Sequence, residues 1–232
     1  MGDNGSRRLW ALCTLFGAGV IAFIVWFSGV IPDRTCTGGG LPPGVSSLLM
    51  YQLARTPAEI EAVFGAAGDP CRATMIAAMD RANTVDLVGF IATYGAFLAF
   101  FFAALAQTGA GIVARCGLVA VATAVGFDVL ETSTQLHITT ALPGSTAALT
   151  ALTIGSRGKY LALAVVCLCA GIAMFARGKI AGRIAGAACI AGGVMVLAGL
   201  VASSALPALS AGNALAWVVM LVYVATAVVR RN

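Results

Sequence analysis

The sequence predicts an all-α integral membrane protein, a six-transmembrane-helix bundle with a small, disulfide-closed extracytoplasmic helical cap. The first observation is composition: 60% of the 232 residues are apolar, only 10% are charged, and the mean hydropathy is +0.96. These values exclude an ordinary soluble globule. The second is the presence of six long apolar runs, and the third is one long polar segment with a cysteine near each end.

The six runs are long enough to cross a bilayer, because a helix rises about 1.5 Å per residue and the hydrocarbon core takes about 20 residues. They are Leu9–Ile31, Asn83–Leu105, Cys116–Leu136, Lys159–Phe175, Ile184–Ala205 and Ala214–Val229. The first run is too long for a signal peptide and lacks a cleavage site, so we expect it to stay as an anchor. The predicted parts are residues 1–31 (amino terminus and first span), 32–82 (cap) and 83–232 (five-helix bundle).

The distribution of basic residues predicts the orientation. With the amino terminus inside, the cytoplasmic segments carry eight bases and one acid, whereas the outer segments carry six bases and five acids. The eight are Arg7, Arg8, Arg115, Arg177, Lys179, Arg183, Arg230 and Arg231. The positive-inside rule then favours a bacterial inner-membrane protein with both termini in the cytoplasm. Because these bases belong to loops, we expect membrane lipid and no nucleic acid as a partner.

Cysteine usage supports an outer location for the cap. Of seven cysteines, only Cys36 and Cys71 lie in it. A disulfide between them would close a loop of about 35 residues and stabilise the fold by ~3 to 4 kcal/mol. The alternative is two free thiols.

Two short segments within the cap carry local signals. Thr56 and Glu59 form a capping box with Pro57 at the first helical position, which predicts a helix ending at Gly65. The apolar stretch 48–53 is too short to span and is expected on the bundle or in the interface. The connector 38–44 is rich in glycine and proline and lacks the Lys-Ser/Thr of a phosphate-binding loop.

Three acids fall inside predicted spans, toward their outer ends: Asp86, Asp128 and Glu131. An acid in mid-bilayer costs about 2.5 to 3.5 kcal/mol, so such residues normally face the protein interior and have partners. Asp128 and Glu131 are three residues apart and share one helix face. We therefore expect a polar cluster below the cap.

Further polar residues are expected in this cluster. Lys159 and Arg157 open the fourth predicted span and are the expected countercharges, while Gln135 extends the acidic face of the third span. Tyr94 lies at the edge of the Asp86 face. The predicted ligand-binding residues are Asp86, Tyr94, Asp128, Glu131, Lys159, Arg157 and Gln135. The alternative is a structural ion-pair network without a ligand.

The other residues of the sequence argue against several kinds of catalytic and metal site. The single histidine, His137, excludes a multi-histidine zinc or haem site, and we expect neither metal nor cofactor. The alternative is a hard cation such as Ca²⁺ or Mg²⁺ held by the three carboxylates. Cys167 and Cys169 lie in mid-span with one residue between them, whereas a redox motif has two. No serine-hydrolase set is apparent. The small residues from Gly182 to Gly193 permit close packing within the bundle, and a homodimer seam is the alternative.

The order of features resembles a family of uncharacterised bacterial multispan membrane proteins. There, an outer segment like 51–65 precedes a span with an aspartate and a tyrosine, here Asp86 and Tyr94. The next span carries an Asp-x-x-Glu-Asn-like motif, matched by Asp128 and Glu131 with Thr132 replacing the asparagine. A lysine, matched by Lys159, opens the following span. The resemblance covers roughly residues 45–165 and implies no activity.

Three functions are consistent with these features. The first is binding of a small polar ligand or a lipid headgroup in an outer-leaflet acidic pocket, with transport or sensing as the consequence. The second is an accessory subunit of a larger membrane complex, with a structural ion-pair network. The third is a membrane enzyme that acts on a lipid through Asp128 and Glu131. The absence of a recognisable catalytic motif disfavours the enzyme.

Overall fold

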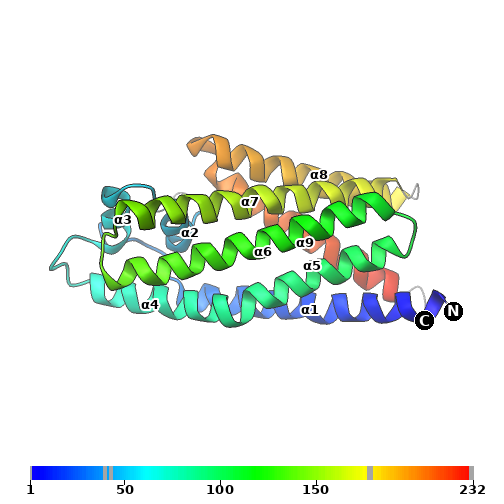
Figure 1. Cartoon of the computed structure of the whole chain (residues 1–232), viewed down its shortest axis with the longest axis horizontal. Helices are drawn as coiled ribbons and strands as arrows, with labels where there is room; N and C mark the ends of the chain where they lie inside the picture. The colour runs from blue at the N-terminus through cyan, green and yellow to red at the C-terminus, as the bar shows by residue number, and fades with distance from the viewer. Residues whose placement is uncertain (1, 39–40, 42–43, 177–179, 230–232) are drawn as a thin grey trace. The chain divides into compact units, whose positions relative to one another are not determined.

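The computed structural model describes residues 2–38, 41, 44–176 and 180–229. Within this part of the chain all regular structure is helical, and six helices are long and apolar enough to cross a membrane (Figure 1). The predicted all-helical class and the number of long apolar helices are thus confirmed. Parts of the glycine-rich connector (39–40 and 42–43) and four of the predicted cytoplasmic bases (Arg177, Lys179, Arg230 and Arg231) lie outside the described residues.

Eight helices are present in the described chain when Arg72–Ala106 is counted as one continuous helix. Their segments are α1 Gly2–Val30, α2 Ser47–Leu53, α3 Pro57–Phe64, α4 Arg72–Val85, η1 Asp86–Phe90, α5 Ile91–Ala106, α6 Gly111–Thr140, α7 Thr146–Phe175, α8 Ile180–Val201 and α9 Leu206–Val229. A short 3-10 turn, η2 (Ser203–Ala205), precedes α9.

The long helices begin before the predicted spans, most of all in two cases. The second long helix begins at Arg72, whereas its predicted span begins at Asn83, and the fourth begins at Thr146, whereas its predicted span begins at Lys159. Polar residues marked the expected ends, but no proline interrupts either extension, so the backbone hydrogen bonds continue. Arg157 and Lys159 therefore lie within α7 and do not open it.

The chain divides into two compact units, and each is described by itself. Unit 1 comprises residues 1–21, 93–124 and 160–232, and unit 2 comprises residues 22–92 and 125–159. All described parts of the segment between α1 and α4, residues 31–71, belong to unit 2. We call it the cap segment.

A disulfide and a capped helix order the cap segment. Cys36 and Cys71 are bonded, with 5.5 Å between their Cα atoms, which confirms the predicted pairing. Thr56 caps α3 through both halves of the predicted capping box, and Gly65 follows the helix with a φ of 76° that favours glycine.

The cap segment shares one apolar core with α4, α6 and α7. Buried side chains from α2 and α3 pack with Met75 and Met79 of α4, Ile138 of α6 and Leu149 and Leu152 of α7. Figure 1 shows α2 and α3 beside the first turns of α7. The short apolar stretch at 48–53 is thus the helix α2, and its Tyr51 is fully buried.

Glycines bring the helices of unit 1 together. A Cβ atom at Gly186 of α8 would lie 2.5 Å from the carbonyl oxygen of Gly171 in α7, and one at Gly192 would lie 2.6 Å from that of Gly212 in α9. Only glycine permits these approaches. The small-residue face of α8 therefore packs on α7 and α9 within the chain.

Candidate functional site

The helix α6 presents four polar side chains on one buried face. Asp128, Glu131, Thr132 and Gln135 follow the spacing i, i+3, i+4, i+7, which places them in one stripe along the helix. Glu131 and Gln135 are both 0% exposed, and Asp128 is 4% exposed. A stripe of this kind in an apolar helix has to be compensated by partners on neighbouring helices.

Lys159 of α7 supplies the charge that compensates this stripe. Its Nζ atom lies 3.0 Å from Oδ1 of Asp128 and 2.7 Å from Oε2 of Glu131. All three side chains are buried. The predicted pairing of Lys159 with the two acids is therefore present in the structure.

Gly155 explains how Lys159 reaches both acids. A Cβ atom at Gly155 would lie 2.8 Å from the backbone nitrogen of Glu131, so α6 and α7 are in backbone contact at this point. Lys159 follows Gly155 by four residues and lies on the same face of α7, one turn further along. The glycine thus sets the short distance that the two ion pairs need.

Asp86 joins the cluster from the second long helix. The hydroxyl of Thr132 donates a hydrogen bond to Oδ2 of Asp86, with 2.7 Å between the oxygens. Asp86 is also the first residue of η1, a π-helical turn in which the Ile91 N–H bonds the Asp86 carbonyl. Single π-helical turns within α-helices are frequent at functional sites. We call Asp86, Asp128, Glu131, Thr132 and Lys159 the acid-lysine cluster.

Several buried polar atoms next to the ion pairs have no hydrogen-bond partner among the described residues. They are Oε1 of Glu131, both amide atoms of the Gln135 side chain, and Nδ2 of Asn83. Leaving such a group unsatisfied costs about 1 to 3 kcal/mol. Buried polar atoms without a partner usually bind a water molecule, an ion or a ligand.

The charges of the cluster do not balance. Three carboxylates gather near one lysine, and Arg157, the second predicted countercharge, is exposed on α7. With every group ionised the cluster would carry an excess of two negative charges. A bound cation or bound protons would remove this excess.

Two further predicted site residues, Tyr94 and Gln135, are buried. Tyr94 belongs to unit 1, where its ring stacks on Trp217 with 5.5 Å between centroids. Gln135, which extends the acidic face of the third predicted span, is fully buried. Its depth follows from the length of α6, which continues to Thr140.

Sequence reasoning also left out two residues that the structure brings to the cluster. Thr132 binds Asp86, and its signal was available, because it is four residues from Asp128 and adjoins Glu131. Gly155 had a weaker signal, a glycine one turn before the lysine.

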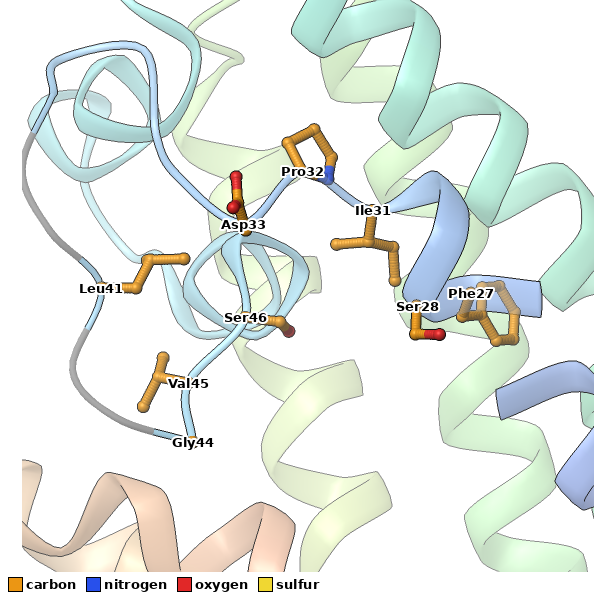
Figure 2. A pocket seen from close by; sticks show the side chains of 9 residues that line it. All are labelled: Phe27, Ser28, Ile31, Pro32, Asp33, Leu41, Gly44, Val45 and Ser46. Atoms are coloured by element: carbon orange, nitrogen blue, oxygen red, sulfur yellow. The ribbon is translucent and has the colours of Figure 1, made fainter. Parts of the chain in front are cut away.

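A separate cavity of about 420 Å³ lies in unit 2 between the end of α1 and the loop before α2 (Figure 2). Its walls are mainly apolar, and Asp33 is the only ionisable residue among the described residues that line it. The lining residues are Phe27, Ser28, Ile31, Pro32, Asp33, Leu41, Gly44, Val45 and Ser46. None of the predicted ligand-binding residues lines this cavity.

Comparison with protein-family models, with curated proteins and with solved structures gives no match for this chain. The resemblance to an uncharacterised membrane family stays a prediction. The function is therefore inferred from the residues and their geometry.

Proposed function

We propose that this chain is a multi-pass membrane protein that binds a small, positively charged solute at the acid-lysine cluster and transports or senses it. The observation that carries the proposal is the fully buried Glu131, which has one oxygen paired with Lys159 and the other without a hydrogen-bond partner in the described chain. A carboxylate oxygen in that position accepts a donor readily.

The charge of the solute follows from the excess of acids. Asp86, Asp128 and Glu131 together exceed what Lys159 neutralises, so a cation is favoured over an anion. The unpartnered amide of Gln135 adds both donors and an acceptor beside the acids. This combination suits a small solute with one cationic group and one polar group.

Burial favours a small solute over a lipid headgroup. Glu131 is 0% exposed and Lys159 is 5% exposed, so a bulky headgroup cannot reach them without separating α6 from α7. The close approach at Gly155 opposes that separation. An enzyme acting on lipids through Asp128 and Glu131 is disfavoured for the same reason.

The orientation that we propose has both termini in the cytoplasm and the cap segment outside a bacterial inner membrane. The Cys36–Cys71 disulfide supports it, since such bonds persist in oxidising compartments. In this orientation the cluster lies near mid-membrane, because Asp86 follows the 14 residues of α4 in a 35-residue helix. Ionisable groups at that depth commonly mark solute or proton pathways.

A second candidate is an accessory subunit in which the cluster is purely structural. The two ion pairs of Lys159 favour it, because they cross-link α6 and α7 without any ligand. In that case the protein would be recovered with a larger complex, and neutralising the acids would reduce the folded yield.

Native mass spectrometry of the gently solubilised protein separates these candidates. We expect an adduct of low mass on the wild type and none on the Asp128→Asn/Glu131→Gln double variant. Glu61→Gln is the matched control, because it neutralises an exposed acid of α3 and should keep the adduct. A bare protein in every sample, with the double variant poorly folded, would contradict the proposal and favour the structural role.

A further inference from the structure

Two hydrogen bonds, one to α4 and one to the first residue of η1, establish the register between this part of the second long helix and α6 in unit 2. Thr139 donates to Oδ1 of Asp80 at 2.7 Å, and Thr132 donates to Oδ2 of Asp86 at 2.7 Å. The position on α6 decreases as the position on α4 increases, so the helices are antiparallel. From Asp80 to Asp86 the helix rises about 9 Å.

Asn83 and Gln135 lie between these two hydrogen-bonded pairs. Asn83 is halfway between Asp80 and Asp86, and Gln135 is near the middle of the α6 segment from Thr132 to Thr139. Asn83 is 1% exposed and Gln135 is 0% exposed. The register therefore places their side chains at one level of the α4–α6 interface.

The polar side chains at this middle level lack hydrogen-bond partners in the described chain. Nδ2 of Asn83 and both amide atoms of Gln135 have no partner in the described chain, although the levels on either side are paired. Side chains on a helix lean toward its amino terminus, so Gln135 leans toward Glu131, whose Oε1 is also unpartnered. By this register the unsatisfied atoms lie between the Asp80–Thr139 hydrogen bond and the ion pairs.

The other end of this row of polar groups lies under the cap segment. Asp80 and Asp86 are half-buried, whereas Glu131 is fully buried. Tyr51 of α2 covers this region, and its hydroxyl donates to the backbone carbonyl of Gln135 at 2.6 Å. We call Asp80, Thr139, Asn83 and Gln135 the polar column, which leads from a partly exposed acid to Glu131.

We infer that water fills the Asn83–Gln135 level of the polar column and that protons exchange between Asp80 and Glu131 through it. Buried waters typically make about three hydrogen bonds to polar groups that lack other partners, which is what this level offers. Each water accepts one proton and passes one on, so the column is unchanged after a transfer. The proton ends on a carboxylate oxygen of Glu131.

The inference deepens the proposed function, on which it rests, by naming the proton as a ligand of the same cluster. The groups that face Glu131 are Asp128 on its own helix, Lys159 on α7 and Asp86 on the second long helix.

The test is infrared spectroscopy of the full-length protein in lipid vesicles, with D₂O as the probe. The carboxyl band that disappears in Glu131→Gln belongs to protonated Glu131. The time course of its shift after transfer to D₂O gives the rate of proton exchange. We expect exchange at least tenfold slower in Gln135→Leu and Asn83→Leu, because an apolar side chain excludes the water. The exposed Gln107→Leu is the matched control and should exchange like the wild type.

A second pair of variants keeps the test possible if a leucine variant does not fold. In that case Asn83→Val and Asn83→Ser replace it, with slow exchange expected for valine and wild-type exchange for serine. Equal rates in all folded variants, or no band that depends on Glu131 at any pH, would overturn the inference.

The mass-spectrometric adduct distinguishes failure of the column from failure of the proposed function. An adduct that needs Asp128 and Glu131, together with unchanged exchange in Gln135→Leu, would overturn the column alone. Slow exchange in Gln135→Leu without any adduct on the wild type would support the column and overturn the cationic solute.

Discussion

The ammonium group of Lys159 lies 2.7 Å from Oε2 of Glu131, so one buried ion pair joins α7 to α6. The same ammonium lies 3.0 Å from Asp128, and Gly155 allows the two backbones to meet one turn away. The ion pairs and the glycine contact therefore depend on each other. Changing either should affect both the stability of unit 2 and the charge of the cluster.

Removing the lysine should destabilise the protein strongly. In Lys159→Met, Asp128 and Glu131 lose their ion-pair partner while they stay buried, and breaking a buried pair from one side costs about 3 to 5 kcal/mol. Thermal unfolding in detergent should show a large loss. Adding Glu131→Leu should restore part of the stability, and an equally low melting temperature in the double variant would contradict this account.

Adding one methyl group at Gly155 should also be costly. Gly155→Ala places a Cβ atom against the Glu131 backbone, and overpacking of this kind costs about 1 to 3 kcal/mol. The control is Gly126→Ala in α6, where nothing lies within 4 Å of the new atom. That change should be neutral or stabilising by up to about 1 kcal/mol. Similar melting curves for both variants would refute the close contact.

Loss of the disulfide should loosen the cap segment. Cys36→Ala/Cys71→Ala opens a loop with a sequence separation of 35, for which chain entropy predicts a loss of about 3 to 4 kcal/mol. Limited proteolysis should then cut between α1 and α4 faster than in the wild type. Cys116→Ser, which changes an exposed free cysteine, should leave the cleavage rate unchanged.

The capping box should make α3 sensitive to acid. Burial raises the pKa of Glu59, but hydrogen bonds from the Arg55 and Thr56 backbones and the Thr56 hydroxyl outweigh it and hold the pKa below its ordinary value. The folded pKa is thus lower than the unfolded one, so the contribution is present above the unfolded pKa of about 4.3 and is lost as pH falls through the folded pKa.

Hydrogen exchange of the α3 amides checks this expectation. In the wild type, protection of the α3 amides should decrease as the pH falls below about 4.3. The rates are first corrected for the intrinsic pH dependence of amide exchange. Glu59→Gln keeps a side chain that can complete the capping box but does not titrate, so it should lose no protection in that window. A parallel loss in both proteins would show that Glu59 is not responsible.

Local sequence signals predicted much of the fold. The apolar runs predicted the six long helices, Thr56 and Glu59 predicted α3, and the two cysteines of the cap predicted their bond. Each of these depends on neighbouring residues or on composition. The second and fourth long helices begin well before the predicted spans, because polar residues such as Arg81 and Arg157 were assigned to the outer segments.

Only part of the candidate site could be predicted from the sequence. Helical spacing placed Asp128, Glu131 and Gln135 on one face, and their charge suggested Lys159 as a partner. Spacing also put Thr132 on this face, but nothing local indicated that its partner is Asp86 or that Tyr94 stacks on Trp217.

By itself, the sequence determined the helical class, the long apolar helices and the acidic face of α6, because periodicity and hydropathy are properties of consecutive residues. Only the tertiary structure decided which polar groups meet. The α4–α6 register pairs Asp80 with Thr139 and Asp86 with Thr132, and the contact at Gly155 brings Lys159 to Glu131. Register and backbone approach depend on side-chain packing between distant segments, and no local pattern encodes them.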